Sequence, residues 1–174
     1  MQRAKYLLLG LALLLCSAAA QFGIPKKPSP GGDIPEQLQA EISSAGRVGK
    51  GDEGILSEQD AADMAHLIHK AQSDPDTMNM VAKMKAEMSS ELEELSKQPA
   101  EAILGGMKQA LEEIKMLDVL FKDPKRALKE MDKEGMIEKA HLKKYQKNPG
   151  LLEEDTRKGL YFQFVSLAAA GGFL

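Results

Sequence analysis

The sequence predicts an all-α protein, a small helical bundle of antiparallel helix hairpins that follows a disordered N-terminal leader. Prolines stand at positions 75, 99, 124 and 149, so they divide the chain at steps of 24, 25 and 25 residues. Apolar residues between these prolines recur at helical spacing. Before the last unit, no strand-like alternation of any length appears. Because the connections at the prolines are short, we expect neighbouring helices to pack antiparallel.

The same prolines predict where helices begin. A short polar residue precedes each of them, in Asp74-Pro75, Gln98-Pro99, Asp123-Pro124 and Asn148-Pro149. A polar residue at this place can cap the first turn, and proline at the first helical position gives up no donor that the helix needs. We call these four polar residue–proline pairs the proline marks. They predict helix boundaries and carry no information about function.

The first 20 residues are typical of a secretory signal peptide. They combine a basic start, an apolar run and small residues at a cleavage site: Arg3 and Lys5, residues 6–15 (YLLLGLALLL), and Ala18 and Ala20. The run is shorter than the ~20 residues that a membrane-spanning helix needs. We therefore predict a secreted or secretory-pathway protein with a signal peptide over residues 1–20.

Residues 21–54 are predicted to be a disordered leader and a Gly-rich linker, with a short helix over residues 35–45. A helical domain over residues 57–174 follows. Gln21-Phe22 and Lys26-Lys27 resemble the leaders of algal proteins that reach the plastid by way of the secretory pathway, which is the alternative destination.

The amino-acid composition of the chain limits the kinds of partner that it can bind. Removal of residues 1–20 lowers the Lys and Arg count from 23 to 21 against 26 acidic residues, so the net charge changes from −3 to −5. This acidity argues against nucleic acid as a partner. The single cysteine, Cys16, lies in the predicted signal peptide, so the mature chain has no disulfide. The sequence does not predict an oligomeric state.

Five predicted helical units follow the linker, and the last of them begins after Pro149. Ser57 begins the first, with Asp60 as a poor substitute for the Glu or Gln of a capping box. The second unit has a one-face stripe of Met78, Val81, Met84, Met88, Leu92 and Leu95. The third contains Gly105-Gly106, which predicts a close helix approach or a kink. Residues 123–147 predict two short helices, and residues 122–147 hold nine Lys or Arg against five Asp or Glu.

The segment after Pro149 becomes uncharged from Gly159 to Leu174. Residues 160–167 (LYFQFVSL) suit a strand by propensity, but the helical neighbours favour a helix. Three interpretations compete for this tail: a core helix, a segment buried in a membrane or partner, and a lipid-anchor signal. Tyr161, Phe162 and Phe164 are the interaction candidates here. The basic stretch Lys139–Lys147 would favour an anionic surface if a membrane is involved.

Methionines supply the second set of interaction candidates: Met78, Met84, Met88 and Met107. Methionine adapts to irregular apolar surfaces, so a Met-rich face could bind varied partners. The alternative is that these residues fill an ordinary helix–helix core. Over Asp74–Met88, and more loosely Asp123–Met136, the chain resembles the client-binding helical modules of some co-chaperones, whose repeats are shorter.

The sequence offers little catalytic chemistry. Two acid-x-x-His pairs, Asp63 with His66 and Glu138 with His141, have the spacing of carboxylate-bridged metal sites, but solvated charges explain them better. No nucleophile motif is present, so we expect no catalytic residue, no metal ligand and no cofactor. The function predicted is a non-enzymatic interaction protein that binds a protein or apolar ligand. The alternatives are a peripheral membrane protein held by residues 159–174 and a helical metal protein or enzyme.

Overall fold

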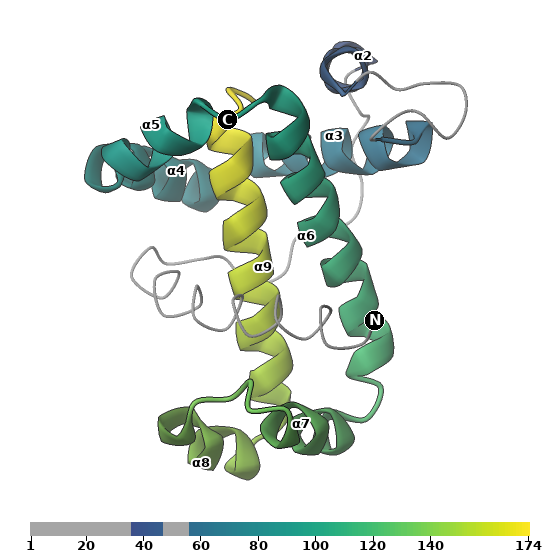
Figure 1. Cartoon of the computed structure of the whole chain (residues 1–174), viewed down its shortest axis with the longest axis vertical. Coiled ribbons are helices and arrows are strands. Elements are labelled where there is room, and N and C mark those ends of the chain that lie inside the picture. The colour runs from purple at the N-terminus through teal and green to yellow at the C-terminus, as the bar shows by residue number, and fades with distance from the viewer. Residues whose placement is uncertain (1–35, 47–55) are drawn as a thin grey trace. The chain divides into compact units, whose positions relative to one another are not determined.

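The computed structural model describes residues 36–46 and 56–174, and within these ranges the chain forms eight helices and no strand (Figure 1). The predicted all-α class is therefore confirmed. The predicted signal peptide, the disordered leader and most of the Gly-rich linker lie outside the described residues. Of the helices that the structure describes, none has both the length and the apolar character needed to cross a membrane.

The described residues fall into two compact units, which we treat separately. Unit 1 contains Glu112–Gln163. Unit 2 contains the described residues up to Leu111 together with Phe164–Leu174. The predicted helical domain, residues 57–174, includes residues of both units.

Unit 2 contains four complete helices: α2 (Glu36–Ala45), α3 (Glu58–Ser73), α4 (Pro75–Glu87) and α5 (Ser89–Ser96). Unit 1 contains two: α7 (Pro124–Lys133) and α8 (Lys139–Lys147). The two longest helices, α6 (Ala100–Leu120) and α9 (Gly150–Ala170), contribute residues to both units. The short helix expected over residues 35–45 is present as α2, and the two short helices expected over residues 123–147 are present as α7 and α8.

Helix α3 begins with a complete capping box. The Ser57 hydroxyl accepts the Asp60 backbone N–H at 3.1 Å, and the Asp60 carboxylate accepts the Ser57 backbone N–H at 3.1 Å. Asp60 also pairs with Lys108 of α6 at 3.1 Å. Burial alone would raise the pKa of Asp60, but the hydrogen bonds from Ser57 and the Lys108 ammonium outweigh it, so the pKa lies below its usual value. The expectation that Asp60 substitutes poorly in the box is therefore wrong.

Two of the four proline marks have the predicted geometry. The Asp74 and Asp123 carboxylates accept backbone N–H groups in the first turns of α4 and α7, each at 3.1 Å, and a proline follows each cap as the first helical residue. Helices α6 and α9 begin one residue after their prolines. Aspartate therefore acts as the N-cap at the two marks where proline is the first residue of the helix.

The predicted stripe of the second unit is interrupted. Met88 has φ −120° and ψ 35°, outside the helical region, and it separates α4 from α5. Serines follow at positions 89 and 90, and serine competes for backbone hydrogen bonds and so favours a helix end. In α4 the buried side chains include Met80, which the stripe left out, whereas Met78 is only partly buried.

Within unit 2, α6 and α9 run antiparallel in close contact. A Cβ atom added to Gly106 would lie 3.0 Å from Cδ1 of Leu167, and one added to Gly171 would lie 3.3 Å from Cγ2 of Ile103. Ile103 therefore lies beside Gly171, and Gly106, which comes later in α6, lies beside Leu167, which comes earlier in the chain than Gly171. The last residues are tied to α3 and α4, because Gln72 Nε2 donates to Phe173 O at 2.9 Å and Lys85 Nζ donates to Leu174 O at 2.8 Å.

The glycine pair of α6 gives a first prediction. A Cβ atom at Gly105 meets nothing within 4 Å, so Gly105→Ala should raise the free energy of unfolding by about 1 kcal/mol through helix propensity alone. At Gly106 the same gain is opposed by the contact with Leu167, so Gly106→Ala should stabilise less. Urea denaturation of both variants checks the difference. Equal stabilisation would show that the helices do not approach closely at Gly106.

Candidate functional site: the lysine stripes of α7 and α8

The structure places most of the predicted interaction residues inside the protein. Met84, Met107 and Phe164 are 0% exposed, and Phe162 is 2% exposed. The others, Met78, Met88 and Tyr161, are partly buried. Side chains in these positions fill the protein's own core in this conformation. The burial fits the alternative in which the methionines form an ordinary helix–helix core.

The uncharged tail is helical through Ala170, as expected. Val165 and Ala168 are completely buried alongside the phenylalanines. Among the three interpretations of the tail, this burial fits the core helix. A segment whose apolar side chains are already buried has little surface left for insertion into a bilayer.

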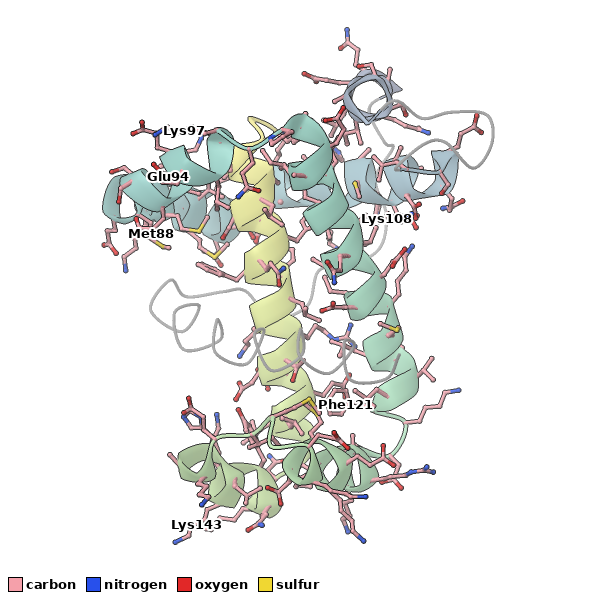
Figure 2. The ribbon with its side chains drawn as sticks, in the orientation of Figure 1. Met88, Glu94, Lys97, Lys108, Phe121 and Lys143 are labelled. Atoms are coloured by element: carbon pink, nitrogen blue, oxygen red, sulfur yellow. The ribbon has the colours of Figure 1, made fainter. Side chains whose placement is uncertain are left out.

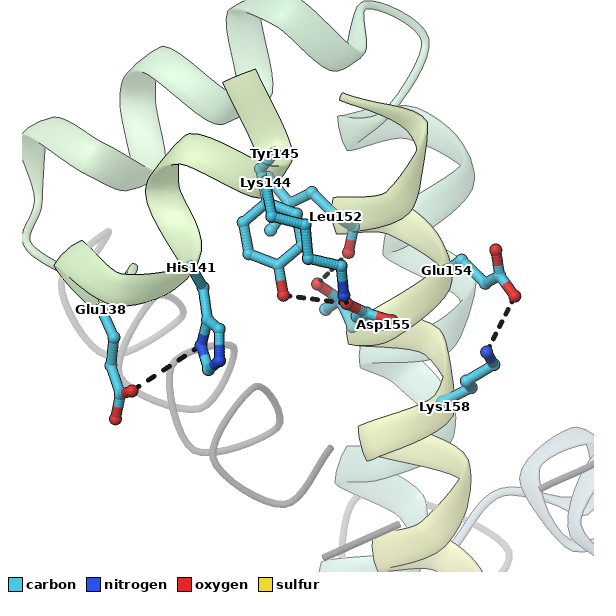
Figure 3. Close-up of polar contacts among 9 residues, drawn as sticks. Glu138, His141, Lys144, Tyr145, Leu152, Glu154, Asp155 and Lys158 are labelled. Atoms are coloured by element: carbon cyan, nitrogen blue, oxygen red, sulfur yellow. Dashed lines mark hydrogen bonds and ion pairs between the residues drawn. The ribbon is translucent and has the colours of Figure 1, made fainter. Parts of the chain in front are cut away.

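The two acid-x-x-His pairs belong to different units, the Asp63 pair to unit 2 and the Glu138 pair to unit 1. His141 Nδ1 lies 3.7 Å from Glu138 Oε2, with both side chains at least half exposed (Figure 3). The Asp63 carboxylate accepts the side-chain amide of Gln59 at 2.7 Å. In the part of the chain that the structure describes, no group of three or more His, Cys, Asp or Glu side chains is arranged to hold a metal ion.

The surface feature that stands out is basic, and the core of unit 1 orients it. Helix α7 buries Ala127, Leu128 and Met131, and α8 buries Tyr145. These side chains belong to one apolar cluster with Leu117, Phe121, Ile137, Leu152 and Leu160. Because each helix has one apolar face against this cluster, its opposite face is left for charged residues.

Lysines occupy the outer face of α7 at a regular spacing. Lys125, Lys129 and Lys133 follow one another at four-residue steps, and all three are exposed. Residues four apart lie on the same face of a helix, so the three side chains form one row. At a rise of about 1.5 Å per residue, the row is roughly 12 Å long between its first and last Cα atoms. We call this row the α7 stripe.

Helix α8 repeats the pattern. Lys139, Lys143 and Lys147 are also exposed and also stand four residues apart, and we call them the α8 stripe. Lys143 extends from α8 away from the apolar cluster of unit 1 (Figure 2). The next lysine, Lys144, is different, because its ammonium donates to Asp155 of α9.

Asp155 fixes the orientation of α8. Its Oδ2 atom accepts both the Lys144 ammonium at 2.7 Å and the Tyr145 hydroxyl at 2.9 Å (Figure 3). The Tyr145 side chain is almost completely buried, so it locks the rotation of α8 about its own axis. With Tyr145 turned inward, the α8 stripe is held on the solvent side.

The six stripe lysines make no ion pair or hydrogen bond with any residue that the structure describes. Of the acids near the α7 stripe, Glu130 pairs with Arg126 at 3.0 Å and Asp123 caps α7, whereas Asp132 and Glu134 are exposed. Lysines four apart on one helix face repel one another, which slightly destabilises the helix. The stripes are therefore a local excess of positive charge on a chain whose net charge is −3.

Sequence reasoning recorded the local excess of basic residues but missed the stripes. The signal in the sequence is the recurrence of lysine at i, i+4 and i+8 on the face opposite the apolar positions. At 100° per residue, Lys125, Lys129 and Lys133 are about 115°, 155° and 165° from the mean direction of the buried α7 side chains. Those angles can be calculated from the sequence once Ala127, Leu128 and Met131 are taken as the buried face.

The role of Asp155 gives a second prediction. Asp155→Ala removes the shared acceptor and should lower the free energy of unfolding by about 1–3 kcal/mol, because Tyr145 loses a charge-assisted hydrogen bond in a buried position. The matched control is Glu154→Ala, since Glu154 is also on α9 and pairs at the surface with Lys158. We expect the control to change stability by less than about 1 kcal/mol. Equal effects in chemical denaturation would contradict this role.

No protein-family model, curated protein or solved structure matches this chain.

Proposed function

We propose that the protein is a non-enzymatic interaction protein that binds an anionic partner through the lysine stripes of α7 and α8. The observation that carries the proposal is the set of six exposed lysines with no partner among the described residues. Because the predicted methionine and aromatic candidates are mostly buried, the stripes are the better-supported binding surface.

Charge distribution supports this proposal. Residues 122–147 carry nine basic and five acidic residues, a local charge of +4, so the rest of the chain carries −7 to give the total of −3. A surface of one sign on a protein of the opposite net charge attracts an anionic partner to one region only. The attraction also orients the protein during the encounter.

A cation-exchange experiment tests the proposal. At pH 7 an acidic protein should pass through a sulfonate matrix unless a local basic surface holds it. We expect the protein to be retained at low salt, and the variant Lys125→Gln, Lys129→Gln, Lys133→Gln to elute at clearly lower salt. The matched control has the same net charge, with Lys83→Gln, Lys97→Gln and Lys115→Gln at exposed positions outside the stripes. Elution of the two triple variants at the same salt concentration would refute the proposal.

A further inference from the structure

We infer that the anionic partner is a linear anionic polysaccharide, with sulfate or carboxylate groups along its chain, and that it lies along the α7 and α8 stripes. The inference rests on the proposed function and names the class of partner. Three properties of the stripes carry it: their one-dimensional spacing, the type of cation that they use, and the absence of an apolar component.

The spacing is that of a row. In each stripe three ammonium groups follow the helix axis at steps of four residues, or about 6 Å. The Lys144 and Tyr145 contacts to Asp155 fix the rotation of α8 and so keep its stripe outward. A row of charges matches an extended polymer with anionic groups at short intervals, whereas a single small anion could use only one or two of the six lysines.

The type of cation in the stripes also favours a polysaccharide. The stripes contain lysine alone, and the one arginine of α7, Arg126, is paired with Glu130 through its Nε atom at 3.0 Å. Arginine binds carboxylate and phosphate in a fixed two-point geometry, whereas lysine is a flexible point charge. Flexible point charges suit a polymer whose anionic groups vary in position along the chain.

The stripes have no apolar component, which argues against two other partners. Among the described residues, the exposed large hydrophobic side chains are Met116 and Val119, and both lie on α6 outside the stripes. A specific protein interface has an apolar centre, and a peripheral membrane helix has apolar residues to insert. Neither is available on the outer faces of α7 and α8.

Nucleic acid fits the stripes less well than a polysaccharide. Single strands are bound by stacking bases on exposed aromatic rings, in addition to basic residues. Tyr145 is the aromatic residue of α8, and it is only 4% exposed. Its ring packs in the apolar cluster of unit 1 and is not available for stacking.

The test measures binding of the full chain to heparin oligosaccharides of increasing length by titration calorimetry. We expect affinity to rise with length and to level off once the oligosaccharide covers both stripes. Replacing the three lysines of either stripe by glutamine should weaken binding by about 100-fold, at roughly a factor of five per lysine. The control variant at positions 83, 97 and 115 should bind like the wild type. Circular dichroism on every variant shows whether the helices are intact.

Three comparison ligands separate this inference from the proposed function: phosphatidylcholine vesicles that contain phosphatidylserine, polyglutamate and duplex DNA. Tighter stripe-dependent binding to any of these than to the oligosaccharide would overturn the polysaccharide inference and leave the proposed function standing. Failure to bind any of the four ligands would overturn both. Binding to the oligosaccharide that both stripe variants retain would also overturn the inference.

Discussion

Phe164→Ala should lower the free energy of unfolding by about 3–5 kcal/mol, the largest effect on stability that we expect from a single substitution in this chain. Phe164 is 0% exposed and is among the largest side chains that are fully buried. Removing its ring leaves a cavity in unit 2 as well as losing the transfer free energy of the ring. A tail that was exposed until it met a membrane or a partner would show no such loss.

Two further variants, a milder substitution at Phe164 and an exposed control, are measured beside Phe164→Ala. Because a loss of 3–5 kcal/mol is a large part of the 5–15 kcal/mol typical of a folded domain, Phe164→Ala could leave too little folded protein to measure. Phe164→Leu keeps most of the volume and should cost about 1–2 kcal/mol. Val119→Ala is the exposed control, since Val119 is 67% exposed, and it should change stability by less than about 0.5 kcal/mol. If Phe164→Leu matched the control in urea denaturation, the core interpretation of the tail would be contradicted.

Charge reversal at the centre of the stripes should have the largest effect on binding. Lys129 and Lys143 each have a lysine four residues away on both sides. The double variant Lys129→Glu, Lys143→Glu replaces attraction to the polysaccharide by repulsion, so affinity for a heparin oligosaccharide should fall by about 100-fold or more. Within each helix, however, the new glutamate attracts its lysine neighbours, so the melting temperature should stay the same or rise slightly.

A fall in affinity together with an unchanged or higher melting temperature could not be explained by unfolding of the variant. A variant that loses affinity because it is damaged would also lose thermal stability. The control variant Lys83→Glu, Lys115→Glu makes the same change in net charge outside the stripes and should bind nearly as well as the wild type. If both double variants lost affinity equally, net charge and not the stripes would govern binding.

Much of the architecture could be predicted because it depends on local interactions. Asp74 and Asp123 cap α4 and α7, and a cap with its following proline involves neighbouring residues only. The interruption between α7 and α8 is likewise local, since Gly135 has φ 71° at the break. The expected close helix approach at the glycine pair of α6 is present at Gly106, which faces Leu167, whereas Gly105 has open space around it.

The rest depended on tertiary packing that periodicity does not report. A stripe at helical spacing continues across Met88, yet the backbone leaves the helical region there and α5 starts anew. Met80 is buried and Met78 only partly so, because the helices around α4 decide which face is covered. For the same reason the sequence leaves both interpretations of the methionines open, because it shows an apolar stripe but not what packs on it.

The salt dependence of binding tests the central claim most directly. The dissociation constant for one heparin oligosaccharide is measured across a series of sodium chloride concentrations, for the wild type and for the Lys125→Gln, Lys129→Gln, Lys133→Gln variant. Each ion contact with a polyanion releases about one counterion, so removal of the α7 stripe should reduce the slope of log affinity against log salt by up to about three. An unchanged slope would show that these lysines do not contact the polyanion, and it would contradict the binding surface proposed for α7 and α8.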